Sequence, residues 1–253
     1  MIDASPGSLA FLLVAGLLAG GVNGVAGGGS LLVFPALLAV GFSPLAANVT
    51  NSVAQWPGYV GIVAGTRRDL VGQRARLRAT APVAVVGSAV GCVLLLLLPD
   101  AVFDAVVPVL VLLASLLTAL GPRIRRWIGT PPAGAPDRMR WLLPAIFFAG
   151  VYGGYFGGAL GVILIAALSL CTSDRLVRLN AHKALLTLLV ATVTVVIFAI
   201  GAPVDWLAVL LLAPTTLVGG YIGGALARRL SETVLRWAVV LVGLTVGIYL
   251  LVT

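Results

Sequence analysis

The sequence predicts an all-α polytopic membrane protein built from two inverted repeats, each a Gly-broken helical hairpin followed by three transmembrane helices. Three observations lead to this fold class: the composition, the length of the apolar runs and an internal repeat. The chain has 253 residues, of which 60% are hydrophobic and 9% are charged. A soluble domain has about 25% charged residues. A chain with so few charges cannot cover itself with polar surface, so a soluble fold is excluded.

The apolar runs define the expected helices. Crossing a bilayer takes about 20 apolar residues. Two apolar regions, 9–40 and 141–172, are too long for one comfortable span and are interrupted by glycines. We expect the first to break at 20–29 and the second at 153–161, each into two short helices that enter the membrane and turn back. Single spans are expected at 46–65, 79–98, 101–120, 180–199, 205–227 and 233–252.

The chain repeats itself. A polar segment rich in Arg, Pro and Gly, 121–140, is expected to be a cytoplasmic linker between a first repeat, 1–120, and a second, 141–253. The halves match at one offset (161 − 29 = 132), and the pairs that include Asn and Ala-Pro are hard to obtain by chance. The matches are Gly29 with Gly161, Asn48 with Asn180, Ala81-Pro82 with Ala213-Pro214, Gly87 with Gly219, and Gly91 with Gly223.

The positive charge predicts the orientation. All 16 Lys and Arg fall within 67–78, 123–140, 175–183 and 228–236. Cytoplasmic loops of membrane proteins collect Lys and Arg. The net charge of +8 is therefore a topology signal and does not indicate a nucleic-acid partner. Equivalent loops of the two halves fall on opposite sides, so the repeats are expected to be inverted, with both termini outside the cytoplasmic membrane.

The glycine breaks predict an anion site. Non-helical backbone at membrane depth survives only where it is buried in protein or lines a cavity, and paired breaks in inverted repeats are typical of transporters. The second helix of each hairpin, starting near Ser30 and near Val162, presents free N–H groups and a positive dipole end to an anion. Glycines at the breaks let the backbone approach a ligand. The candidates are Gly27, Gly28, Gly29 and Ser30 in the first hairpin, and Gly158 and Gly161 in the second.

Other glycines have a simpler interpretation. In membrane helices, small residues allow close helix packing. We prefer this role for the glycines outside the breaks, which are Gly16, Gly20, Gly87, Gly91, Gly219 and Gly223.

Polar residues at the start of the next helix complete the predicted site. Polar groups inside a membrane are costly and usually functional. Lys183 and His182 are the only basic residues placed to enter the site. Alternatives stay open: Lys183 as a snorkelling anchor, His182 as a hydrogen-bonded structural residue, and the asparagines as helix caps. The substrate-binding candidates are Asn48, Thr50, Asn51 and Gln55 in the first repeat and Asn180, His182 and Lys183 in the second, where Thr187 corresponds to Gln55.

Several chemistries are disfavoured. The eight acidic residues all lie in expected loops or interfaces, so a proton relay through an intramembrane carboxylate and a cation substrate are not expected. Cys92 and Cys171 lie in apolar runs and offer no nucleophile–base pair. We predict no enzyme, no catalytic residue, no metal and no cofactor. The competing functions are a channel for small anions or weak acids and a membrane scaffold without transport.

Three motifs carry a resemblance to a known family. They are GVAGGGSLLVFPALL followed by the Asn-Val-Thr-Asn helix start, the second copy GGYFGGALGVILIAAL, and APTTLVGGYIGGALARRLS. With them the chain resembles the sulfite exporter TauE/SafE family of bacterial membrane transporters. The resemblance implies alternating-access transport of a small sulfur-containing anion, such as sulfite, a sulfonate or a related oxyanion. The expected partners are that anion and the lipid bilayer, with a homodimer as a candidate assembly. The second hairpin departs from the first motif, because Leu160 and Val162 stand at glycine-like positions.

Overall fold

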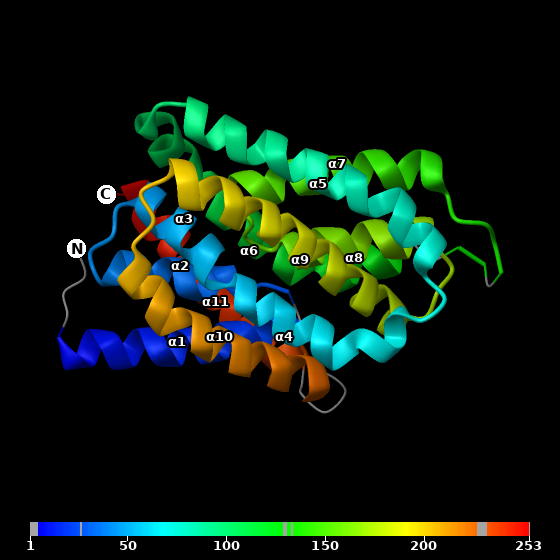
Figure 1. Cartoon of the computed structure of the whole chain (residues 1–253), viewed down its shortest axis with the longest axis horizontal. Helices are drawn as coiled ribbons and strands as arrows, with labels where there is room; N and C mark the ends of the chain where they lie inside the picture. The colour runs from blue at the N-terminus through cyan, green and yellow to red at the C-terminus, as the bar shows by residue number, and fades with distance from the viewer. Residues whose placement is uncertain (1–4, 26, 129–130, 133, 227–231, 253) are drawn as a thin grey trace.

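The computed structural model describes residues 5–25, 27–128, 131–132, 134–226 and 232–252, and this part of the chain contains helices and loops without a strand (Figure 1). The predicted all-α class is confirmed. The helices are α1 Pro6–Val25, α2 Ser30–Ala39, α3 Pro44–Ala54, α4 Trp56–Thr66, the 3₁₀-helix η1 Arg67–Leu70, α5 Arg74–Leu97, α6 Asp100–Ile128, α7 Met139–Tyr155, α8 Leu160–Cys171, α9 Leu176–Gly201, α10 Trp206–Leu226 and α11 Glu232–Val252.

Five of the described helices are long and apolar enough to cross a membrane. They are α1, α5, the first part of α6 (Asp100–Arg123), α9 and the first part of α10 (Trp206–Gly223). The expected single span at 46–65 is wrong in one respect, because Gln55 separates α3 from α4. Pro57 lies at the start of α4. A proline lacks the N–H that would continue a helix, and its ring clashes with the carbonyl group four residues earlier.

Both long apolar regions are broken, as predicted. α1 and α2 form a first hairpin, and α7 and α8 form a second. At each break a glycine has a positive φ, 78° at Gly27 and 76° at Gly157, a conformation that other residues rarely adopt. Two details differ from expectation. α8 begins at Leu160, two residues before Val162, and α1 has 20 residues, so this arm is long enough to span a membrane alone.

The segment expected to be a linker is partly helical. α6 continues to Ile128 and α7 begins at Met139, so the connection between them is shorter than 121–140. Some of the segments discussed above lie outside the described residues, namely 129–130, 133 and the arginines of 228–229.

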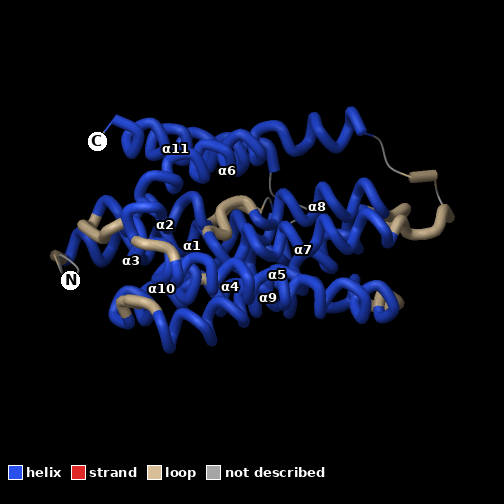
Figure 2. The backbone as a smooth tube through the Cα atoms, turned by 90° about the horizontal axis from the view of Figure 1, so that it is seen from above, coloured by secondary structure: helices blue, strands red, loops and turns tan. Residues whose placement is uncertain are grey.

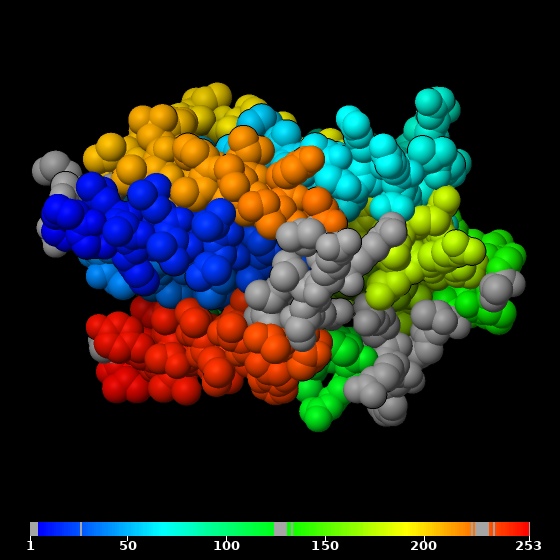
Figure 3. Space-filling view, turned by 90° about the horizontal axis from the view of Figure 1, so that it is seen from below, coloured from blue at the N-terminus to red at the C-terminus, as the bar shows by residue number. Residues whose placement is uncertain are grey.

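The helices pack in layers through small residues. α6 and α11 lie together along one side of the molecule (Figure 2), and α1 runs between α10 and α11 on the face shown in Figure 3. α1 packs along α10, and α5 packs along α7. A Cβ atom added to a glycine in these two contacts would collide with the neighbouring helix, which confirms the predicted packing role. These glycines are Gly16, Gly20, Gly219 and Gly223 between α1 and α10, and Gly87 and Gly91 between α5 and α7.

The two ends of the molecule differ in charge. The start of α1 and the end of α11 lie at one end, on the left of Figure 1, and η1 and residues 134–138 lie at the other. Arginines of 67–78, 138–140 and 175–178 therefore gather at the end opposite the start of α1, which we call the arginine-rich end.

Candidate functional site

The tips of the two hairpins touch inside the molecule. A Cβ atom added to Gly27 would lie 3.0 Å from the Cα atom of Gly161, and a Cβ atom on Gly161 would lie 3.0 Å from the Cα atom of Gly27. Real Cβ atoms rarely approach other atoms this closely, so the contact is made by backbone alone. Two segments separated by more than 100 residues thus meet at their helix breaks.

A small cavity beside this contact holds a basic residue. Lys183 is 3% exposed, and its Cδ atom lies 3.5 Å from the position of a Cβ atom on Gly161. The N-terminal turn of α8 reaches the same space, and a helix N-terminus favours negative charge. We call this space the charged cavity. It is lined by Asn23, Gly27, Tyr59, Ile62, Gly157, Ala159, Leu160, Gly161, Lys183, Ala184 and Thr187.

A second cavity adjoins the first and is lined by uncharged residues alone. We call it the neutral cavity. Tyr59, Gly157, Leu160 and Thr187 line both cavities, so these four residues form the boundary between them. The remaining residues around the neutral cavity are Ser30, Ser52, Gln55, Gly153, Val190, Ala191 and Thr194.

A hydrogen-bonded chain holds the tip of the first hairpin. The Gly29 N–H donates to Asn23 Oδ1 over 2.7 Å, and Asn23 Nδ2 donates to Gln55 Oε1. Gln55 Nε2 in turn donates to Ser30 Oγ (3.0 Å) and to Asn51 Oδ1 (2.7 Å). The amide of Gln55 thus has a partner for its oxygen and for both of its hydrogens. The Gly29 N–H is therefore capped by Asn23, and the Leu31 and Leu32 N–H groups donate to the Gly28 and Gly29 carbonyls, so these three groups are not available to an anion.

Seven of the predicted site residues come together at these cavities. Gly27, Gly161 and Lys183 line the charged cavity, and Ser30 and Gln55 line the neutral cavity. Gly29 and Asn51 belong to the hydrogen-bonded chain beside them.

The structure places five other candidates away from both cavities. Gly28 faces Val239 and Thr118, and Gly158 faces the ring of Phe156. Asn48 Nδ2 donates to the Tyr155 carbonyl over 3.0 Å, the Thr50 hydroxyl accepts the Asp205 N–H over 3.0 Å, and Asn180 is half-buried and lines neither cavity.

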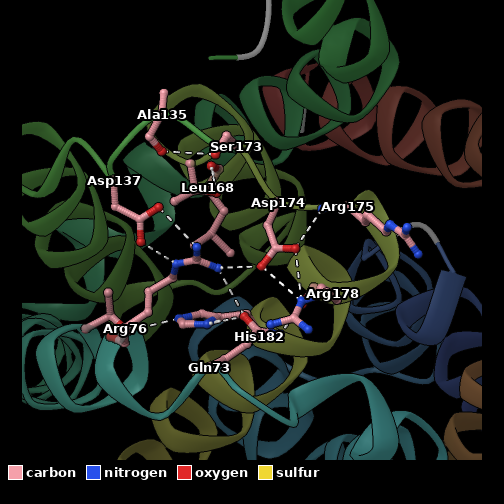
Figure 4. A network of polar contacts seen from close by, with 12 residues as sticks. Gln73, Arg76, Ala135, Asp137, Leu168, Ser173, Asp174, Arg175, Arg178 and His182 are labelled. Carbon is pink, nitrogen blue, oxygen red and sulfur yellow. Dashed lines mark hydrogen bonds and ion pairs between the residues drawn. The ribbon is translucent and has the colours of Figure 1, made fainter. Parts of the chain in front are cut away.

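His182 lies outside both cavities, in the polar network at the arginine-rich end (Figure 4). Its ring nitrogens lie 3.0 Å from Thr80 Oγ1 and 3.1 Å from Gln73 Oε1. The geometry corresponds to the alternative of a hydrogen-bonded structural histidine.

Arg76 is the centre of that network. Its guanidinium pairs with Asp137, which precedes α7, over 2.7 Å and with Asp174, which follows α8, over 3.1 Å. Arg178 also pairs with Asp174, over 2.9 Å. Burial alone would raise the pKa of Asp174, but hydrogen bonds from the Arg175 N–H, Arg76 and Arg178 outweigh it and lower that pKa below its ordinary value. The network therefore ties the two ends of the second hairpin to α5.

The sequence analysis missed several lining residues, including Asn23 and Tyr59 at the charged cavity and Ser52 and Thr194 at the neutral cavity. Asn23 and Tyr59 were not among the candidates, although Asn23 is the one polar side chain of the glycine-rich stretch 21–29 and Tyr59 follows Gln55 by one helical turn. Thr187 was noted only as the counterpart of Gln55. A polar group at membrane depth was the available signal in each case.

Comparisons with known proteins agree with the motifs. The chain is 28% identical over 253 residues to the probable membrane transporter protein YfcA of Escherichia coli K12, covering 98% of this chain and 91% of that protein. A probable membrane transporter protein of Haemophilus influenzae is 26% identical over 242 residues (92% and 90% covered), and the protein ORF9 of a Sinorhizobium species, also described as a probable membrane transporter, is 25% identical over 252 residues (96% and 92%). No solved structure is significantly similar to the chain. The sequence pattern of the sulfite exporter TauE/SafE family matches residues 12–250. Because this match spans nearly the whole chain, the protein belongs to the sulfite exporter TauE/SafE family of multi-pass membrane proteins.

Proposed function

We propose that the protein is a secondary transporter that moves a small sulfur-containing anion, such as sulfite, a sulfonate or a related oxyanion, across the cytoplasmic membrane by alternating access. One observation carries the proposal: Lys183 is buried beside the N-terminus of α8, at the point where two broken helices touch. A cation and a helix N-terminus together favour an anion. Among the described residues, no carboxylate lines either cavity, so no acidic side chain there opposes a negative charge.

An inverted-repeat architecture is part of this proposal, and the helix boundaries support it. The starts of α3 and α9 and of α5 and α10 both differ by 132 residues (176 − 44, 206 − 74). The hairpins follow a different offset, since Gly27 and Gly157 share a positive φ and differ by 130. α8 has 12 residues and α2 has 10, which accounts for the change. The ungapped match of Gly29 with Gly161 is therefore replaced by Gly29 with Ala159.

The packing supports the same relationship. Exchanging the halves converts the contact of α1 with α10 into that of α7 with α5, and both contacts occur. The glycines agree in detail: Gly20 faces the backbone of Thr216, and Gly150 faces the backbone of Ala84. The two hairpin glycines, Gly20 and Gly150, differ by 130 residues, and the residues they face, Ala84 and Thr216, differ by 132.

We propose that the arginine-rich end is cytoplasmic, because cytoplasmic segments collect arginine. Single cysteines at Asp69 and Pro203 test this orientation. Both native cysteines are buried, so a membrane-impermeant maleimide applied to intact cells has little background. We expect labelling at position 203 and none at 69 until the membrane is permeabilised. Labelling of both positions from the same side would contradict the proposed topology.

Flux measurements test transport itself. In proteoliposomes, saturable counterflow of labelled sulfite is expected of a carrier. Unsaturable conductance would instead identify a channel, and absence of flux for every sulfur oxyanion and sulfonate tried would favour a scaffold. Thermal stabilisation of the purified protein by the same compounds identifies the preferred anion, because a ligand that binds only the folded state raises the unfolding temperature.

A further inference from the structure

The neutral cavity is the repeat-related counterpart of the charged cavity. Most residues that line the neutral cavity are the equivalents, in the other half of the chain, of residues that line the charged cavity. The pairs are Asn23 with Gly153, Gly27 with Gly157 and Leu160 with Ser30 at the hairpin offset of 130, and Tyr59 with Ala191, Ile62 with Thr194, Ala184 with Ser52 and Thr187 with Gln55 at the offset of 132. Two cavities with this relationship are one kind of site present twice.

The two copies differ in charge. Lys183 corresponds to Asn51 at the offset of 132, and Asn51 accepts a hydrogen bond from Gln55 beside the neutral cavity. The helix N-terminus that reaches the neutral cavity is that of α2, at Ser30, which is the counterpart of Leu160 at the start of α8. The neutral cavity therefore keeps the helix end of the charged cavity but has no cation.

Buried hydroxyl groups line the neutral cavity. Ser30 is 8% exposed; its oxygen accepts from Gln55, and its side chain is also hydrogen-bonded to Tyr59. Thr187 and Thr194 are 5% and 3% exposed and donate to helix carbonyls, Lys183 O and Ala191 O. Such bonds to the helix backbone are weak local contacts, so these hydroxyls can rotate toward a ligand. Tyr59, which lines both cavities, adds a fourth hydroxyl at their boundary.

We infer that the neutral cavity is a second subsite for the transported anion, formed by uncharged hydrogen-bond donors at the N-terminus of α2. This inference rests on the proposed transport function. The anion binds first at Lys183 and then passes the boundary formed by Tyr59, Leu160 and Thr187 to a subsite that holds it less tightly. With the charged cavity alone, the anion would have a tight binding site and no weaker site from which to dissociate.

Filling each cavity in turn tests the inference. Ala184 lines only the charged cavity and Ala191 lines only the neutral cavity. We expect Ala184→Leu to abolish both equilibrium binding of labelled sulfite and counterflow. Ala191→Leu is expected to leave the affinity within about threefold and to slow counterflow at least tenfold. Ala105→Leu, at an exposed position of α6, is the matched control and is expected to behave as the wild type.

The outcomes separate the inference from the proposed function. Counterflow at the wild-type rate in Ala191→Leu, or loss of sulfite affinity as large as in Ala184→Leu, would overturn the second subsite. A wild-type protein without saturable counterflow would instead refute transport itself. If Ala191→Leu does not fold, Thr194→Val provides the same test, because it removes one hydroxyl at nearly constant volume. Unchanged counterflow in a folded Thr194→Val protein would then count against the inference.

Discussion

Removing the charge of Lys183 is the most direct test of the anion site. Two unit charges about 4 Å apart interact by about 4 kcal/mol at an effective dielectric constant of about 20. A hydrogen bond to a charged group contributes about 1.5–3 kcal/mol net. Lys183 is 3% exposed, so solvent screens it little. We therefore expect Lys183→Gln to lose about 2–4 kcal/mol of binding free energy, which raises the Kd for sulfite roughly 30- to 700-fold.

Titration calorimetry of the purified protein with sulfite measures this change. Arg78→Gln removes the same charge from an exposed position near the arginine-rich end and controls for net charge, so its Kd is expected to stay near that of the wild type. Lys183 is also the sole lysine of the chain, which makes an amine-reactive reagent selective for it and the N-terminus. Bound sulfite is expected to slow acylation of Lys183. A Kd shift below threefold together with no protection would refute an anion site at this residue.

Three further changes test the fold and the polar network. Arg76→Gln removes the ion-pair partner of Asp137 and one of the two arginine partners of Asp174. Breaking a fully buried pair costs about 3–5 kcal/mol, but these side chains are 13–22% exposed. We therefore expect a loss of about 1–3 kcal/mol, measured as a lower unfolding temperature than that of the exposed control Arg74→Gln. Gly154→Val directs a side chain into the backbone of Ser88 and is expected to destabilise the folded protein by about 3 kcal/mol or more. Gly7→Val, with open space around it, is expected to leave the stability unchanged. Equal stability of the two variants would contradict the close packing of α7 on α5. The folded-state pKa of Asp174 is lowered, so the stability contributed by its carboxylate is fully present above the unfolded pKa of about 3.9 and is lost as the pH falls through the folded value. The difference in unfolding temperature between wild type and Asp174→Asn is therefore expected to shrink below about pH 4. A difference that stays constant with pH would show that the carboxylate charge is not its cause.

Composition and glycine spacing predicted the helical fold well because they indicate that the chain is surrounded by lipid. A chain with 9% charge and apolar runs of helical length has few alternatives in lipid. Three consecutive glycines, 27–29, marked the first helix break, and two Gly-Gly pairs at 153–154 and 157–158 marked the second. The break at Gln55 was missed. A single proline in an apolar run is compatible with a kinked but continuous helix, as Pro82 in α5 and Pro214 in α10 illustrate.

The candidate site was predicted less completely, because neighbours across the fold decide which polar groups remain available. Sequence spacing identified Lys183 and Gln55, which line the charged and the neutral cavity. It gave no information that Asn23 caps the Gly29 N–H or that His182 turns toward Gln73. Adjacent residues on a helix point about 100° apart. Lys183 can therefore line the charged cavity while its neighbour His182 joins the polar network at a different helix contact.

The two halves of the chain differ at positions that the proposed repeat would pair. Position 57 is proline in the first half, and its counterpart at 189 is leucine, so α9 is continuous where α3 and α4 are separate. Likewise, Asn51 in the first half occupies the position equivalent to Lys183 in the second half. A second buried lysine at position 51 would place two like charges beside adjoining cavities and would carry the desolvation penalty of a charge twice. An amide at this position avoids both costs and, through its bond with Gln55, holds the start of α2 in place. In the proposed mechanism, each repeat supplies one helix N-terminus, and Asn51 in place of a lysine gives the neutral cavity the lower affinity from which the anion is released.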